Sequence, residues 1–462
     1  MTSKKQVLGF FKLVMINVIA VDSIRTLPFS AVYGFSLVFF YLLAALVFFI
    51  PTALVSAELG TGWPNRGGIY VWVREAFGKK VSFLVIWLNW IYNIFWYPTI
   101  LALIAGTFAY FFNPELAHNT LYMAGSVVVV FWIATIINCF GMRASSALST
   151  AGALIGTIFP MLLIAGMGVY WIASGRPMEI ELTRETFLPS GVDMNNIAFM
   201  STVFFGLLGL EMAATHAQEM RNPARDYPKS VFTSIWIILG TIVFASLAIA
   251  IAVPNQELSL AIGIMQAFTV FFNAYGLDWA VPLIAGCIVL GGLSGVGAWS
   301  IGPTKGLLVA SEDGSLPPIF SKVNKHHAPV GVLIIQAVIV SLLALLYVLF
   351  PTVNKSFWLL SVITAQLALL VYVALFATAL KLFHTKPDVK RHYRIPGKKL
   401  GIWVVCLLGG CSSLIVMILG FIPTEQIKTQ SILRYELMLI GGMAIACILP
   451  FLIYKRRKVS SN

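Results

Sequence analysis

Two ionisable residues stand close together in the first long apolar stretch of the chain. Asp22 and Arg25 belong to the run VDSIRTLP at 21–28, with apolar sequence on both sides. If this stretch crosses a lipid bilayer, each charge costs about 2.5 kcal/mol or more, so a partner or a function must retain it. Spaced at i and i+3, the two side chains could bind each other. Alternatively, Asp22 could face an ammonium group and Arg25 a carboxylate of a bound molecule, or the two could form a gate.

A later apolar stretch contains a second buried carboxyl candidate. Glu211 follows the run GLLGL at 206–210, and His216 lies a little further along the chain. A buried carboxyl group could exchange a proton with either side of a membrane, and histidine titrates near neutral pH. Both are therefore candidates for proton or pH sensing. Each also has a structural alternative, since Glu211 could hydrogen-bond loosened backbone and His216 could be satisfied at a helix end.

Aromatic residues form two further candidate groups. Trp299 follows a glycine-rich run at 291–297. Aromatic faces can hold the apolar part or the cation of a small molecule, and we favour this role for Trp299. An aromatic stripe at helical spacing more often packs between helices, and we favour packing for the earlier group. That group consists of Trp87, Trp90, Tyr92, Trp96 and Tyr97.

The elements that position these residues are predicted to be transmembrane helices. Only 11% of the 462 residues are charged and 59% are hydrophobic, whereas soluble domains carry roughly 25% charged residues. The apolar residues fall into about twelve stretches, each long enough for one spanning helix, the structure that satisfies the backbone of a single segment in lipid. The predicted spans are 8–32, 35–56, 81–112, 121–140, 147–173, 196–219, 230–253, 279–310, 330–350, 357–383, 400–422 and 432–454.

The distribution of basic residues orients these spans. Most of the 31 Lys and Arg residues lie in the loops of one side or beyond the two ends, and few, such as Arg176 and Lys355, lie on the other side. Basic loops stay cytoplasmic, so we expect both termini in the cytoplasm and the protein in the cell's inner or plasma membrane. The net charge of +13 then needs no nucleic acid partner.

The first and sixth spans are interrupted near their middles, around Asp22 and Glu211. If the chain consists of two five-helix repeats, these spans open the two halves, which is the pattern of an inverted-repeat transporter. Both carboxyl groups then reach the middle of the bilayer, where loosened backbone groups are free to bind a zwitterion. The predicted division is a single transporter domain, 1–462, with repeats at 8–173 and 196–383 and two additional helices at 400–454.

Other classes of function find less support in the sequence. The intramembrane residues Asp22, Arg25, Glu211 and His216 lack the spacing of a nucleophile with its base or of a metal cluster, so we expect no enzyme, metal site or cofactor. The five cysteines fall in or at the ends of spans, where they are interpreted as packing residues. The sequence also has no phosphate-binding glycine-rich motif that ends in Lys-Ser/Thr, which argues against transport driven by ATP.

Longer segments resemble a known family. The segment 214–228, ATHAQEMRNPARDYP, closely resembles the end of helix 6 and the following loop in bacterial glutamate/γ-aminobutyrate antiporters, and 34–40, 263–270 and 298–306 are similar to other parts of these proteins. The similarity covers almost the whole chain, which is identified as a member of the amino acid–polyamine–organocation (APC) superfamily. The resemblance implies the LeuT-type fold, with five-helix inverted repeats plus two extra helices, and substrate exchange by alternating access.

The resemblance also implies site residues. Aligned on Pro28, the family's helix 1 motif, whose backbone amides bind the substrate carboxylate, falls on 21–24. The helix 6 glycine-Val-Glu pattern falls on 209–211. Phe205 matches the aromatic gate position, and Trp299 matches the tryptophan that stacks on the substrate. With Arg25 added, the predicted substrate-binding residues are Asp22, Ser23, Ile24, Arg25, Phe205, Gly209 and Trp299.

The chain departs from this family at two of these positions. The family's exchangers have no acid or base where Asp22 and Arg25 stand. An aspartate there repels an anionic substrate unless Arg25 neutralises it, which favours a neutral or cationic amino acid, or glutamate bound mainly through Arg25. Exchange of amino acids or amines is the favoured function, and proton-coupled symport of the same substrates is the alternative. Nothing in the sequence indicates an oligomeric state.

Overall fold

The computed structural model of the chain describes residues 9–64, 67–140, 152, 154–189, 194–212, 220–324, 328–422 and 432–459. Its elements in these ranges are helices, with no strand among them. Ten helical segments are long and apolar enough to cross a membrane. The prediction of an all-α membrane protein is confirmed at this level.

The first part of the chain forms the following α-helices and short 3-10 or π segments (η). They are α1 (Phe10–Val21), η1 (Ile24–Thr26), α2 (Leu27–Ala31), α3 (Ser36–Ala44), η2 (Ala45–Phe49), α4 (Ile50–Gly62), α5 (Ile69–Phe77), α6 (Lys79–Ala109), η3 (Pro114–His118), α7 (Thr120–Cys139), η4 (Leu154–Ile158), α9 (Phe159–Ala173) and α10 (Arg184–Phe187).

The second part continues in the same way. Its elements are α11 (Met194–Gly206), α12 (Pro223–Ala252), α13 (Gly263–Ala274), η6 (Asp278–Ala280), α14 (Val281–Glu312), η7 (Pro318–Ser321), α15 (Val330–Ala344), α16 (Leu346–Leu349), α17 (Val353–Thr385), α18 (Lys398–Leu419) and α19 (Ile432–Val459).

The ten candidate spans correspond to ten of the twelve predicted stretches. The two exceptions are the stretches with interruptions, 8–32 and 196–219. In the first, α1 ends at Val21 and a new helix starts within a few residues; in the second, α11 ends at Gly206. Residues 263–274 lie outside the predicted spans, and they form the short helix α13 in the structure.

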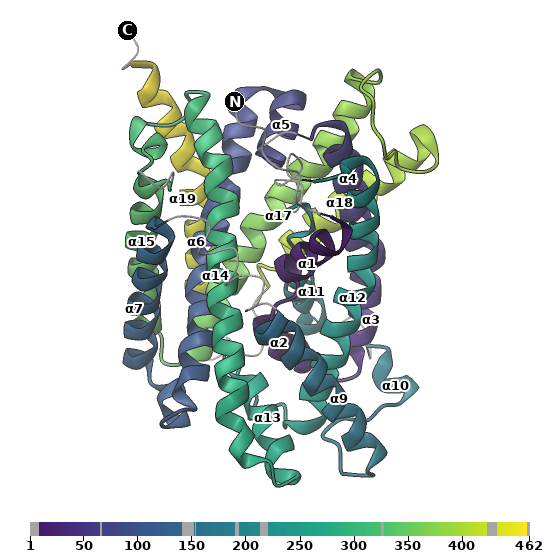
Figure 1. Cartoon of the computed structure of the whole chain (residues 1–462), viewed down its shortest axis with the longest axis vertical. Coiled ribbons are helices and arrows are strands. Elements are labelled where there is room, and N and C mark those ends of the chain that lie inside the picture. The colour runs from purple at the N-terminus through teal and green to yellow at the C-terminus, as the bar shows by residue number, and fades with distance from the viewer. Residues whose placement is uncertain are drawn as a thin grey trace.

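The interrupted helices lie at the centre of the bundle (Figure 1). Helix α1 packs against α12 and α14, and α11 packs against α17 and α18. The long helix α6 packs against both α14 and α17, and these two pack in turn against α1 and α11 respectively. The breaks in α1 and α11 are therefore enclosed by protein, which is the setting in which irregular backbone is tolerated at membrane depth.

One end of the bundle is closed by polar contacts of the short helix α5. Arg74 donates to Asp313 at the end of α14 over 2.5 Å, and the Tyr70 hydroxyl donates to the same carboxylate over 2.8 Å. Partial burial raises the pKa of Asp313, but the hydrogen bonds from Tyr70 and Arg74 outweigh it, and the pKa falls below its usual value. Glu75 pairs with Lys386 beyond α17. Helix α5 thus ties α14 to α17.

A third ion pair, at the end of α4, is buried. Glu58 and Arg391 lie 2.6 Å apart, with side chains only 6% and 3% exposed. The second carboxylate oxygen of Glu58 accepts the Ile395 backbone N–H, and Arg391 donates to the carbonyls of Leu382 and Lys386. Each charge is therefore paired and hydrogen-bonded, which anchors the α17–α18 connection to α4.

Replacing Glu58 should reveal the cost of leaving Arg391 buried without its partner. We expect Glu58→Ala to destabilise the protein by about 3–5 kcal/mol, because one buried charge then remains uncompensated. The matched control is Glu75→Ala, which breaks the half-exposed pair with Lys386 and should cost about 1 kcal/mol or less. Unfolding of both purified variants in detergent measures the difference, and equal losses would contradict the structural role of the buried pair.

Candidate functional site

The first helix break is made by extended backbone at Asp22 and Ser23. Their ψ angles of 116° and 115° leave the helical region directly after Val21. The chain then starts η1 and α2, and Pro28 fits the beginning of α2 because a first-turn N–H has no intrahelical acceptor to lose. The opening N–H groups of the new helical segment carry the partial positive charge of a helix start.

The second break depends on Gly209. Its φ of +114° lies in the region that favours glycine. A Cβ there would come within 2.8 Å of the Ala20 carbonyl oxygen and 3.1 Å of the Trp299 ring. The absence of a side chain at Gly209 therefore lets the end of α11 approach both the end of α1 and Trp299.

A tyrosine of α17 links this second break to Glu211. The Gly209 N–H donates to the Tyr372 hydroxyl over 2.7 Å, and that hydroxyl donates to Glu211 Oε2 over 2.5 Å. Tyr372 and Glu211 are both buried. The other carboxylate oxygen, Oε1, has no partner among the described residues. Glu211 thus lies where a movement of the broken backbone or a gained proton would change its bonding.

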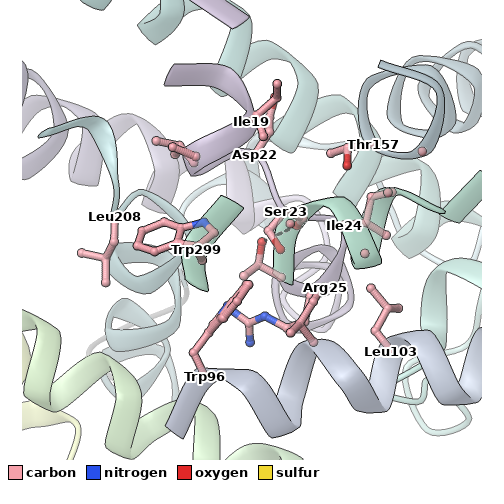
Figure 2. Close-up of a pocket in the computed structure, with 18 of the residues that line it drawn as sticks. Ile19, Asp22, Ser23, Ile24, Arg25, Trp96, Leu103, Thr157, Leu208 and Trp299 are labelled. Carbon is pink, nitrogen blue, oxygen red and sulfur yellow. Dashed lines mark hydrogen bonds between the residues drawn. The ribbon is translucent and has the colours of Figure 1, made fainter. Parts of the chain in front are cut away.

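A cavity of about 60 Å³ separates the breaks from α6 and α14, enough for a few water molecules (Figure 2). Of the predicted substrate-binding residues, Gly209 does not line it but packs against Trp299, which does. The predicted residues that line the cavity are Asp22, Ser23, Ile24, Arg25, Phe205 and Trp299. The structure therefore brings the two interrupted segments to one space.

Asp22 and Arg25 do not bind each other, so the pairing alternative is wrong. Asp22 Oδ2 accepts a hydrogen bond of 2.8 Å from Thr241 of α12, whereas Arg25 extends toward Trp96 (Figure 2). An i, i+3 contact requires a continuous helix. Here α1 ends at Val21 and a new helical segment starts only at Ile24, so Asp22 lies in the break while Arg25 lies in the next segment, and helical spacing does not relate the two side chains.

Arg25 has sparse polar contacts for a buried guanidinium. Nη1 donates to the Ser361 hydroxyl at 3.3 Å, Nε has no partner among the described residues, and the guanidinium carbon lies 4.4 Å from the centre of the Phe205 ring. The residue is only 2% exposed. The ion pairs resolved in the described part of the chain join other residues. Arg25 is thus a desolvated cation at the cavity without a carboxylate partner from the described chain.

Two members of the earlier aromatic group also line the cavity, which the packing interpretation missed. Tyr92 and Trp96 face it from α6, and the Trp96 ring lies 5.8 Å from that of Trp299. Trp87 and Trp90 instead donate to the Ala446 carbonyl and to a glutamine of α15, as packing residues do. The i, i+4 spacing of Tyr92 and Trp96 was the available signal for a shared face.

Two cavity residues lacked any signal of this kind, and one candidate cannot be placed. Asn93 and Thr157 line the cavity as single polar residues in apolar helical segments.

His216 lies outside the described residues, as does 213–219 as a whole. Within the described ranges, no cluster of His, Cys, Asp and Glu residues could hold a metal ion.

Comparisons with known proteins place the chain in one family. The amino acid permease family profile matches residues 8–444. A Legionella pneumophila protein named as an uncharacterized transporter is 50% identical, over 99% of this chain and 98% of its own length. A glutamate/gamma-aminobutyrate antiporter of Lactococcus lactis is 29% identical over 98% and 91%, and a "Probable agmatine/putrescine antiporter" of the same species is 26% identical over 93% and 90%. The chain therefore belongs to the amino acid permease family, a family of membrane transporters rather than enzymes.

Proposed function

We propose that this protein is a secondary active transporter that exchanges amino acids, or an amino acid and an amine, by alternating access. The observation that carries the proposal is the meeting of two helix breaks at one cavity, with Arg25, Phe205 and Trp299 around it. Exchange is favoured over proton symport because the glutamate/gamma-aminobutyrate antiporter and the probable agmatine/putrescine antiporter to which the chain is similar are both named as antiporters.

The cavity offers opposite partial charges to a zwitterion. The N–H groups at Ser23 and Ile24 open a helical segment and suit the substrate carboxylate. Helix α11 ends at Gly206, where its last carbonyl oxygens carry partial negative charge and suit an ammonium group. The aromatic rings of Phe205, Trp96 and Trp299 supply apolar faces for the remainder of the substrate. Asp22 completes the proposed set as a polar group on the α12 side of the cavity.

We further propose the LeuT-type architecture for the whole chain. Twelve spans would form repeats at 8–173 and 196–383 and two additional helices at 400–454, within one domain. The helix breaks support this division because each lies in the first member of a half. Figure 1 places α5 and the basic α17–α18 connection at one end of the bundle, and α10 and α13 at the other. The first end is the proposed cytoplasmic side of a plasma membrane, with both termini there.

Exchange in proteoliposomes tests the proposal. We expect uptake of a radiolabelled amino acid or amine to rise several-fold when unlabelled substrate is trapped inside, because exchange requires the return step of the carrier to be loaded. The measurement is initial uptake across a substrate panel, with and without internal substrate. Uptake that needs only an imposed proton gradient would replace exchange with symport.

Glu211 is the proposed proton-responsive group of the described chain, with His216 as the second candidate. Glu211→Gln keeps the shape and the hydrogen-bonding capacity of the side chain but removes its titration. We expect transport to persist with a flattened pH dependence, measured as initial uptake from about pH 5 to pH 8. The exposed Glu115→Gln is the control for loss of a carboxyl group, and it should keep the wild-type profile. A wild-type profile in Glu211→Gln would remove this residue from proton sensing.

Tyr372 is expected to hold the α11 break in a working geometry. Tyr372→Phe leaves the Gly209 N–H and Glu211 without their shared partner, at a cost of about 1–3 kcal/mol for each buried polar group. We expect the transport rate to fall about tenfold or more with the amount of membrane-inserted protein unchanged.

Tyr122→Phe is the matched control for this substitution. It removes a similar hydroxyl, whose 2.8 Å hydrogen bond to the Ala105 carbonyl lies away from the cavity. Equal transport rates for the two tyrosine variants would show that the link through Tyr372 does not matter for transport.

A further inference from the structure

Arg25 is a permanent positive charge in the cavity that the described protein does not neutralise. A guanidinium stays protonated in proteins and offers five N–H donors in a planar fork. Among the described residues, Arg25 makes one hydrogen bond, a long one of 3.3 Å from Nη1 to Ser361, and the Phe205 ring covers one face of the fork. Burial at 2% exposure removes the compensation that water would otherwise supply. An unpaired buried charge of this kind is costly unless a ligand completes it.

Asp22 does not supply the missing anion. Its Oδ2 accepts from Thr241 on α12, and no ion pair joins its carboxylate to Arg25. A carboxyl group can take up a proton and become neutral, whereas Arg25 cannot lose its charge. The space beside Arg25 is instead lined by the aromatic rings of Trp96 and Phe205.

We propose that Arg25 binds a carboxylate in the side chain of the substrate, so that the preferred substrate is an acidic amino acid. The α-carboxylate would occupy the N–H groups of Ser23 and Ile24, which leaves Arg25 for a second anionic group. A bidentate contact from the free edge of the fork fits a planar carboxylate. This inference rests on the proposed transport function and names its substrate class, in place of a neutral or cationic amino acid held by Asp22.

Isosteric substrate pairs test the inference. In wild-type proteoliposomes near pH 7, where both acidic side chains are ionised, L-glutamate should compete for uptake roughly tenfold better than L-glutamine, and L-aspartate better than L-asparagine. Arg25→Gln should lose this preference and transport the amides at least as well as the acids. Arg25→Lys keeps the charge without the planar fork, so it should retain part of the preference.

Arg176→Gln is the matched control. Arg176 also packs on aromatic rings, those of Trp171 and Tyr275, and donates to the Ala274 carbonyl, but it does not line the cavity. Its substitution removes the same charge and should leave the preference for acids unchanged. Loss of preference in this variant would trace the effect to net charge and overturn the assignment to Arg25.

The remaining outcomes distinguish failure of the inference on substrate class from failure of the proposed transport function. Wild-type exchange that favours amides or amines, or Arg25→Gln that still favours acids, overturns the inference and leaves the transport function standing. No exchange of any amino acid or amine by the wild type overturns the proposed function itself. If Arg25→Gln fails to insert, the wild-type preference and the Arg25→Lys variant still decide between acids and amides.

Discussion

The architecture depends on satisfying broken backbone in a place where lipid offers no hydrogen bonds. Two helices stop at the middle of the bundle, at Val21 and Gly206, and each break leaves polar main-chain groups that only protein, water or a ligand can bind. The long helices α6, α14 and α17 enclose these groups, and α17 supplies Tyr372 to one of them. Residues of both breaks line the cavity, so the proposed binding capacity of the site would be a consequence of the same interruptions.

The buried charged residues differ in the partners that compensate their charges, and this difference distinguishes the site from the rest of the protein. Glu58 and Arg391 neutralise each other directly. In Asp22 and in Glu211, one carboxylate oxygen accepts a hydrogen bond from a hydroxyl group of a neighbouring helix. The other oxygen has no partner among the described residues. Among the described residues, Arg25 combines a fixed charge, one long hydrogen bond and a position at the cavity. Its poor compensation is the reason why we propose it as a binding group rather than a structural one.

The sequence predicted the features that depend on neighbouring residues in the chain. Apolar length identified the membrane helices, and polar or small residues within two stretches located both breaks. The contacts across the bundle were beyond such reasoning. The link from Gly209 to Tyr372 joins residues 163 positions apart, and the bond of Asp22 to Thr241 spans 219. The predicted Asp22–Arg25 pair is wrong for a related reason, since α1 ends at Val21 and the i, i+3 spacing of a continuous helix does not apply across the break.

The close approach at Gly209 also explains why the two breaks would act together during transport. Its Cα lies where a side chain would collide with the Ala20 carbonyl and the Trp299 ring, and its N–H is held by Tyr372. Packed groups at such distances have few alternative arrangements, so a shift of the α11 break requires a shift at the end of α1 or in α14. Residues from both proposed repeats are thereby joined at a single contact beside the cavity. A substrate that binds to either break would therefore change the equilibrium of both, provided that it contacts the two conformations unequally.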